Sequence, residues 1–298
     1  ILAHTIFMAI NYFIIASGVK GLEKAVRFLM PGLLLLLFIL FIYSLTSGSF
    51  MDGVKFMFTP NFNALNWDGV LTAMGLACFT LSIGMGAIMA YGAYLPQETS
   101  ITNATVSVVI ADTGIAMLAG LVIFPLVFAN GLNPGEGPDL VFKTLPLVFG
   151  QMQVGTFLAT IFFVLLSFAA LTSALGLMEP AVAWMVESTE YNRKQCAATI
   201  ASIIWFLGLG TALSFNTMAD FKFLNGTIYE NVDFLTSNIM LPLGAVFTTF
   251  FAAWIMSKNS TSEELGGHGI AYRIWRFLAK YFAPIAILVI FLQAIGWI

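Results

Sequence analysis

Long apolar stretches separated by short polar segments dominate the chain. We expect about eight membrane spans, at residues 1–19, 28–47, 70–95, 103–129, 153–186, 196–215, 234–257 and 280–298. A run of about 20 apolar residues crosses a bilayer as a helix, whereas the alternating pattern of a membrane barrel is not visible. The pattern therefore predicts an all-α, polytopic membrane protein with a single transmembrane domain over residues 1–298.

The centre of the third apolar segment has an unusual composition for an uninterrupted helix. Thr80, Ser82, Gly84 and Gly86 fall within seven residues, and glycine weakens a helix. A break in hydrocarbon leaves N–H and C=O groups unpaired, which is tolerated where the break lines a cavity or faces protein. We interpret this break as a binding site. The alternative is that the glycines let another helix approach closely.

Composition and charge support the membrane assignment and orient the chain. The protein is 59% hydrophobic and 9% charged, against about 25% charged in soluble domains. Nine of the twelve basic residues fall between spans one and two, five and six, or seven and eight. The positive-inside rule places these segments in the cytoplasm. We expect a multi-pass protein of the plasma (inner) membrane. This orientation makes the first span enter from the outside, so a complete protein with a cytoplasmic N-terminus would have an odd number of spans upstream.

Three acidic residues in or near the spans each need a reason, because charges in a membrane are costly. Asp112 lies well inside its span, and oxygen ligands of this kind suit a hard cation such as Na⁺. The alternative for Asp112 is a protonated acid hydrogen-bonded to a helix. We expect Glu179 to be structural, capping a broken backbone, and Asp233 to be either functional or merely interfacial.

Two further patterns have both a functional and an ordinary interpretation. The Ala169 carbonyl and the Thr172 and Ser173 hydroxyls share one helical face and offer three oxygens to a small cation. The alternative is that these hydroxyls bond to the helix itself. Gly21 and Pro31, ten residues apart, would let the inner end of the second span unwind, or are simply a loop glycine and a near-terminal helix proline.

The outer loop that follows the fourth span contains a turn cluster at 133–139 and a short amphipathic piece at 140–146. This loop either folds inward as a lid or only connects two spans. Asn225 begins a glycosylation pattern, and His268 is isolated in a cytoplasmic loop. No nucleophile elbow, phosphate loop or metalloprotease helix is visible, so we do not expect an enzyme.

The residues around the break carry a resemblance to a known family. Residues 79–87 closely resemble the broken sixth helix of the neurotransmitter:sodium symporters, and residues 169–173 resemble their eighth helix. The lid segment 137–146 and the run 233–238 are similar too, so the likeness covers essentially the whole chain, in order. It is closest to the bacterial amino-acid transporter branch. The resemblance implies a leucine-transporter-like inverted-repeat fold with discontinuous helices. The chain would correspond to helices four to eleven, with three N-terminal helices missing.

The resemblance also assigns roles to individual residues. It implies a first sodium site at Thr80 and Asp112, and a second at Ala169, Thr172 and Ser173. The substrate-binding residues that it implies are Phe79, Thr80, Ser82, Met85, Ser173 and Leu177. The gating residues that it implies are Asp233 on the outer side and the Gly21–Pro31 pair on the inner side.

The function implied by the resemblance is sodium-coupled symport of amino acids by alternating access. Met85 and Leu177 make the implied pocket apolar, which favours hydrophobic or aromatic L-amino acids. Family members often have Asn where Asp112 stands, and the chloride-dependent ones need an anion nearby. The resemblance implies that the Asp112 carboxylate replaces this chloride ion, so we expect chloride independence. The expected partners are the amino acid, Na⁺ and the bilayer, with no nucleic acid. The alternative is a passive channel or a non-transporting membrane protein of the same fold.

Overall fold

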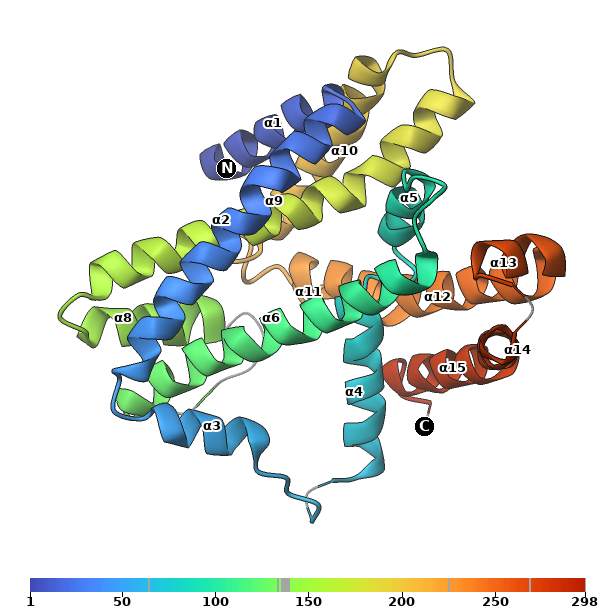
Figure 1. Ribbon diagram of the computed structural model, residues 1–298. Helices are drawn as coiled ribbons and strands as arrows, with labels where there is room; N and C mark the ends of the chain where they lie inside the picture. The colour runs from blue at the N-terminus through green and yellow to red at the C-terminus, as the bar shows by residue number, and fades with distance from the viewer. Residues whose placement is uncertain (64, 133, 135–139, 225, 268, 298) are drawn as a thin grey trace. The chain divides into compact units, whose positions relative to one another are not determined.

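The computed structural model describes residues 1–63, 65–132, 134, 140–224, 226–267 and 269–297, and among them it contains helices and no strand (Figure 1). The α-helices are α1 (Leu2–Ala16), α2 (Val19–Leu45), α3 (Phe50–Phe58), α4 (Trp67–Thr80), α5 (Ala87–Ala93), α6 (Ile101–Ala129), α8 (Leu145–Gln151), α9 (Gly155–Ser188), α10 (Arg193–Leu213), α11 (Ile228–Asp233), α12 (Leu241–Phe250), α13 (Lys258–Glu264), α14 (Ile270–Phe277) and α15 (Ala283–Ala294). π-Helical segments lie at Leu140–Thr144, Phe234–Met240, Phe251–Ile255 and Leu278–Phe282. The all-α prediction is confirmed.

Six helical stretches in the described residues are long and apolar enough to cross a membrane. They are Val19–Leu45, Ile101–Ala129, Gly155–Ser188, Arg193–Leu213, Ile228–Ile255 and Ile270–Ala294. The other two predicted spans differ for separate reasons. The first forms α1, which has 15 residues, and the third is divided into α4 and α5.

Two predicted span boundaries were wrong by about ten residues. The second helix begins at Val19 rather than at residue 28, and the last begins at Ile270 rather than at 280. In both cases the helix continues through basic residues, because long charged side chains keep their apolar stems on the helix and their charged ends in water. α2 is continuous through both Gly21 and Pro31. The interpretation as a loop glycine and a near-terminal proline was therefore wrong, because both residues lie inside the helix.

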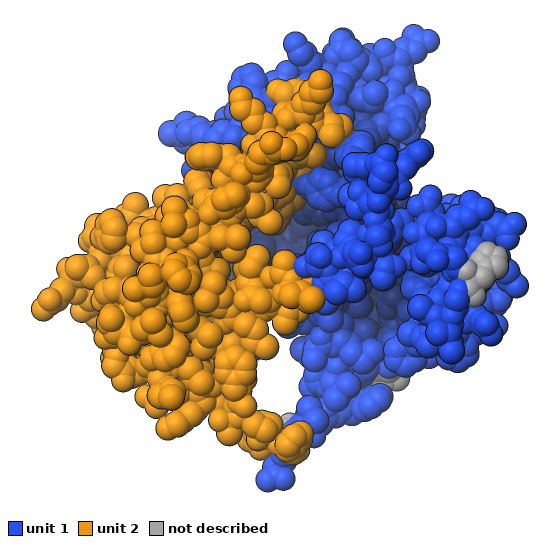
Figure 2. Space-filling view, in the orientation of Figure 1, with its two compact units in different colours: residues 1–16, 63–109, 176–298 blue, residues 17–62, 110–175 orange. Residues whose placement is uncertain are grey.

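The chain forms two compact units, which Figure 2 distinguishes by colour. Unit 1 contains residues 1–16, 63–109 and 176–298, and unit 2 contains residues 17–62 and 110–175. Within unit 1, α1 lies along α10, and α15 packs against both α12 and α4. The break between α4 and α5 is thus held in a unit that also contains α12.

The core of unit 2 is formed by α2, α6, α8 and α9. Its buried side chains are Leu37, Leu40, Val122, Leu126, Val127, Leu145, Val148, Phe149, Leu158, Ile161 and Phe162. α3 packs on α6 at Gly53, where a Cβ would lie only 2.6 Å from the Pro125 ring. Next to it, the Phe56 and Phe124 ring centroids are 4.8 Å apart. The outer loop after α2 is therefore a helix anchored to α6.

Candidate functional site

The interruption predicted in the third apolar segment is present. α4 ends at Thr80 and α5 begins at Ala87. Between them, Ser82, Gly84 and Gly86 have φ values of 52°, 90° and 82°. These lie in the left-handed region, which glycine adopts without steric cost and other residues rarely adopt. The two glycines thus allow the turn, and Ser82 is held in a strained conformation, as is common at binding sites.

The break leaves backbone polar groups available. The Ser82 amide donates to the Phe79 carbonyl at 2.9 Å, and the Met85 amide donates to the Ser82 carbonyl at 3.3 Å. In the part of the chain that the structure describes, the amides of Gly84 and Gly86 donate no hydrogen bond. The carbonyls of Gly84 and Met85 likewise accept none from the described residues. The turn therefore offers N–H groups to an anion and carbonyl oxygens to a cation.

The break also touches α12 backbone to backbone. A Cβ at Gly84 would lie 2.4 Å from the Ala245 amide nitrogen and 2.5 Å from the Leu241 carbonyl oxygen. From the other side, a Cβ at Gly244 would lie 2.4 Å from the Gly84 carbonyl oxygen. The alternative explanation of the glycines, that they let another helix approach closely, is therefore correct for Gly84. Gly244 was not predicted from the sequence, because its role depends on this contact with Gly84.

The break carries four of the six predicted substrate-binding residues. Phe79 and Thr80 end α4 with exposed side chains, and Ser82 and Met85 lie half-buried within the turn. Ser173 and Leu177 lie on α9, Ser173 in unit 2 and Leu177 in unit 1. These four residues lie together at the break, and their role in binding the substrate stays a prediction.

The predicted second sodium site forms a compact group on α9. The Thr172 hydroxyl donates to the Ala169 carbonyl oxygen at 2.9 Å, which places two of the three predicted oxygen ligands side by side. Ser173 follows on the same helix, and its side chain is exposed. Back-bonding, the alternative for these hydroxyls, therefore occurs at Thr172. A hydroxyl that donates to a carbonyl keeps its lone pairs, so the hydrogen bond is compatible with a bound cation, and the sodium site itself stays a prediction.

The predicted first sodium site is divided between the two units. Thr80 ends α4 in unit 1, and Asp112 lies half-buried near the middle of α6 in unit 2. Because the two residues belong to different units, their joint binding of one sodium ion stays a prediction.

A buried ion pair lies in unit 1, and its partners differ from those expected. The Glu179 side chain is fully buried, and it accepts hydrogen bonds from the Tyr94 hydroxyl at 2.6 Å and from Arg193 Nη2 at 2.5 Å. Arg193 Nε also donates to the Ile15 carbonyl at 2.9 Å. Glu179 thus connects α9 with the end of α5, the start of α10 and the end of α1.

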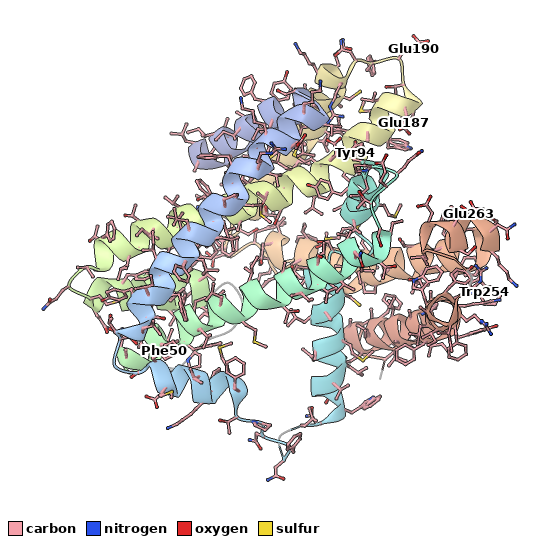
Figure 3. All side chains as sticks on the ribbon, in the orientation of Figure 1. Phe50, Tyr94, Glu187, Glu190, Trp254 and Glu263 are labelled. Carbon is pink, nitrogen blue, oxygen red and sulfur yellow. The ribbon has the colours of Figure 1, made fainter. Side chains whose placement is uncertain are left out.

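The expectation that Glu179 caps a broken backbone was wrong, because its partners are side chains. From the sequence, Arg193 only marked the cytoplasmic side, and Tyr94, which Figure 3 labels beside α5, was not predicted as a partner. The missed signal is general: a carboxylate inside a span requires a cation or hydroxyl partner. The nearest basic residue along the chain after Glu179 is Arg193.

The outer-side predictions are only partly described. Asp233 ends α11 with an exposed side chain, and its Oδ1 accepts a hydrogen bond from the Ser237 hydroxyl at 3.1 Å. The first part of the predicted lid, residue 133 and residues 135–139, lies outside the described residues, as do Asn225 and His268. The remainder of the lid is helical, formed by the π-helical Leu140–Thr144 and by α8.

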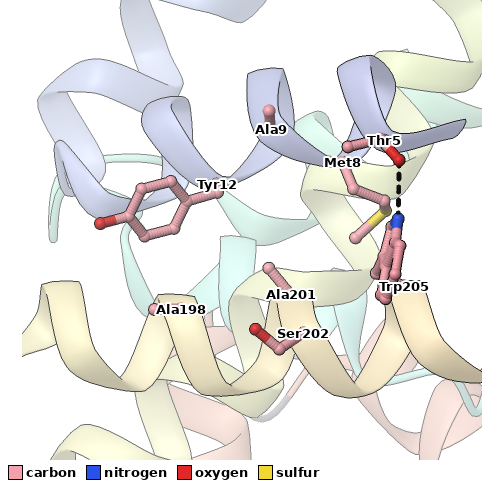
Figure 4. A pocket seen from close by; sticks show the side chains of 8 residues that line it. All are labelled: Thr5, Met8, Ala9, Tyr12, Ala198, Ala201, Ser202 and Trp205. Carbon is pink, nitrogen blue, oxygen red and sulfur yellow. Dashed lines mark hydrogen bonds between the residues drawn. The ribbon is translucent and has the colours of Figure 1, made fainter. Parts of the chain in front are cut away.

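A mostly apolar hollow of about 280 Å³ lies between α1 and α10 (Figure 4). Its lining residues are Thr5, Met8, Ala9, Tyr12, Ala198, Ala201, Ser202 and Trp205. Trp205 Nε1 donates to the Thr5 hydroxyl at 3.0 Å across one end of the hollow. None of the predicted site residues lines it, so this hollow is separate from the break.

The fold and the break together define a class: a multi-pass helical membrane protein with a discontinuous helix whose free backbone groups suit the binding of a solute. The model of the Sodium:neurotransmitter symporter family matches residues 1–297. The chain belongs to this family of transporters, as the resemblance at the break predicted.

Individual relatives agree with this assignment. An uncharacterized sodium-dependent transporter of Bacillus subtilis, YhdH, is 36% identical over 99% of the chain and 66% of its own length. A similarly named protein of Haemophilus influenzae is 32% identical over 97% of the chain and 64% of its own length. The solved structure of MhsT in complex with L-phenylalanine has a TM-score of 0.87 and 39% identity, covering 97% of this chain and 67% of MhsT. The chain thus spans about two thirds of the length of these relatives.

Proposed function

We propose that the protein is a sodium-coupled secondary active transporter that imports amino acids. The observation that carries this proposal is the turn between α4 and α5, where the amides of Gly84 and Gly86 and the carbonyls of Gly84 and Met85 have no hydrogen-bond partner among the described residues. In a membrane such groups must face protein or line a cavity, and the close contact of α12 with the turn is at Gly84. A zwitterionic solute and a small cation satisfy both kinds of group.

Sodium is the coupling ion in this proposal. The adjacent oxygens of Ala169 and Thr172, together with Ser173, would hold one ion through neutral oxygens on α9. Thr80 and Asp112 would hold the other. Bound Na⁺ supplies positive charge and couples transport to its gradient. The Asp112 carboxylate takes the place of a chloride ion, so transport is chloride-independent.

The proposed substrate is a hydrophobic or aromatic L-amino acid. Met85 in the turn and Leu177 on α9 present apolar side chains. The likeness to MhsT, whose structure was solved with L-phenylalanine, supports the same substrate class. The backbone amides of the turn would receive the carboxylate of the substrate, because N–H groups left free by a helix break favour negative charge.

The mechanism is alternating access. Asp233 lies at the outer side, and α2, continuous in this structure, would loosen between Gly21 and Pro31 when the protein opens inward. Each positive charge that moves inward gains about 2.3 kcal/mol per 100 mV. Two sodium ions therefore supply enough free energy to concentrate an amino acid many-fold.

Uptake of labelled L-phenylalanine by the full-length protein in proteoliposomes tests this proposal. We expect uptake that requires an inward Na⁺ gradient, is lost when K⁺ replaces Na⁺, and persists when gluconate replaces Cl⁻. Uptake that is indifferent to Na⁺ would contradict the coupling. A chloride requirement would contradict the role of Asp112.

A second test addresses the sodium ligands on α9. Thr172→Val removes one proposed ligand oxygen, and loss of one such interaction, about 1.5 kcal/mol or more, should raise the Na⁺ concentration for half-maximal uptake at least about tenfold. Ser167→Ala is the matched control, because Ser167 lies on the same helix, is exposed, and also bonds to its own helix, at the Phe163 carbonyl. Equal effects of the two variants would refute the proposed ion site.

A further inference from the structure

Basic and aromatic side chains line a second hollow, of about 460 Å³, in unit 1. Lys258, Arg273, Arg276 and Lys280 contribute charge, and Tyr272 and Tyr281 contribute aromatic rings. These residues come from α13, α14 and the π-helical Leu278–Phe282. Figure 3 labels Trp254 and Glu263 in this part of the unit. The proposed transport mechanism uses none of these residues.

Arg276 is held in place by neutral oxygen atoms. Its Nη1 donates to the Thr261 hydroxyl at 3.1 Å and to the Tyr272 hydroxyl at 2.9 Å, and its Nη2 donates to the Ala253 carbonyl at 3.2 Å. These contacts orient the guanidinium group without neutralising its charge. A guanidinium fixed in this way is prepared to bind an anion, and its planar donors match phosphate.

Lys280 is positioned by an aromatic ring and by an irregular backbone. Its Nζ lies 4.1 Å from the centre of the Trp254 ring. Trp254 Nε1 in turn donates to the Lys280 carbonyl at 3.2 Å. Both residues lie in π-helical segments, Phe251–Ile255 and Leu278–Phe282, which contact each other. Such π-helical turns inside helices are frequent at functional sites.

The charge of the hollow is not balanced locally. Among the described residues, none of the four basic side chains forms an ion pair with a carboxylate. The acidic residues of the adjoining α13, Glu263 and Glu264, are exposed to solvent. Four cations beside two solvated acids leave a net positive surface that attracts an anion.

The position of the hollow indicates which anion it receives. It lies between two spanning stretches, Ile228–Ile255 and Ile270–Ala294, at the end that the distribution of basic residues places in the cytoplasm. Tryptophan and tyrosine favour the membrane interface, and basic pockets between helices on the cytoplasmic side bind anionic headgroups. Phe277 and Phe282, 62% and 60% exposed, provide apolar surface for acyl chains beside it.

We propose that this hollow binds the phosphate headgroup of an anionic phospholipid from the inner leaflet. Arg273, Arg276 and Lys280 contact the phosphate, and the Trp254 ring positions Lys280. The acyl chains remain in the bilayer beside the exposed phenylalanines. This lipid site is independent of the proposed transport function, because its residues take no part in binding Na⁺ or amino acid.

Native mass spectrometry of the full-length protein in neutral detergent, titrated with phosphatidylglycerol, tests the proposal. Each basic side chain near an anionic lipid contributes about 1 kcal/mol, or about fivefold in affinity. Arg273→Gln with Lys280→Gln should therefore weaken binding about 30-fold. The matched control is Lys20→Gln with Lys24→Gln, which removes two charges from the start of α2 and should leave the affinity within about twofold.

Two other ligands test whether the site prefers an anionic lipid, and one further variant tests whether the charge-removing variant is still folded. Phosphatidylcholine with the same acyl chains and inorganic phosphate should both bind at least about tenfold more weakly than phosphatidylglycerol. Arg273→Lys keeps the charge and should retain most of the affinity, which separates loss of charge from loss of fold. Equal weakening in the control pair, or inorganic phosphate binding as tightly as the lipid, would overturn the proposal.

Discussion

Gly84 satisfies two requirements at once, and each excludes a side chain. Its φ of 90° belongs to the left-handed region, and its Cα faces the backbone of α12 at a distance that leaves no room for a Cβ. A larger residue would have to adopt a strained conformation and also displace Ala245. The turn therefore depends on this position more than on Gly86, where the nearest atom to a Cβ would be 3.6 Å away.

Gly84→Ala should destabilise the protein by about 2 kcal/mol or more, because it adds backbone strain and overpacking. Gly92→Ala is the matched control: Gly92 lies in α5 with nothing within 4 Å of its added Cβ. There alanine should be neutral or stabilising, by up to about 1 kcal/mol. The melting temperature of the purified full-length protein measures both. A similar fall for the two variants would show that the contact with α12 does not matter.

At the residue scale, the sequence predicted what depends on local composition and missed what depends on distant partners. The break at Thr80–Gly86 was predictable because glycine and hydroxyl residues concentrate there. Gly244 was not, because its role depends on a contact with Gly84, 160 positions earlier in the chain. The same holds for Tyr94, whose partner Glu179 is 85 residues away.

At the scale of elements, the Glu179 pair connects helix ends that are far apart in sequence. Arg193 is the first residue of α10, and its guanidinium contacts both the Glu179 carboxylate and the last turn of α1. Burial makes the pair sensitive to loss of one partner, because the remaining charge is left without compensation.

Glu179→Gln and Arg193→Gln should each cost about 3–5 kcal/mol in unfolding free energy, since each leaves one charge uncompensated. The double variant should cost less than the sum, because both charges are then absent. Arg27→Gln is the control: Arg27 and Glu23 are 79% and 61% exposed, and such pairs contribute about 1 kcal/mol or less. Thermal unfolding of the four variants measures the coupling, and strict additivity would contradict it.

Helix boundaries were predicted less well than helix positions. α2 and α14 begin about ten residues before the apolar runs from which the spans were predicted. A helix continues beyond the hydrocarbon for as long as its backbone N–H and C=O groups form hydrogen bonds with each other. Hydropathy marks where a helix enters hydrocarbon, and it does not mark where the hydrogen-bonded helix begins. The first turns of both helices contain basic residues, which favoured a loop when only hydropathy was considered.

At the scale of the whole molecule, a ligand that binds the folded state raises its stability. At a sodium concentration one hundred times its dissociation constant, the gain is about 2.7 kcal/mol per site. The full-length protein should therefore melt at a higher temperature in NaCl than in KCl of equal ionic strength, and Thr172→Val should reduce the difference. Identical melting in the two salts would count against sodium binding. This measurement requires no transport.

The contact between Gly84 and Gly244 has a consequence for motion. Two backbones that meet without intervening side chains have no flexible atoms to absorb a shift. In the proposed transport cycle, we therefore expect α12 and the interrupted segment to move together.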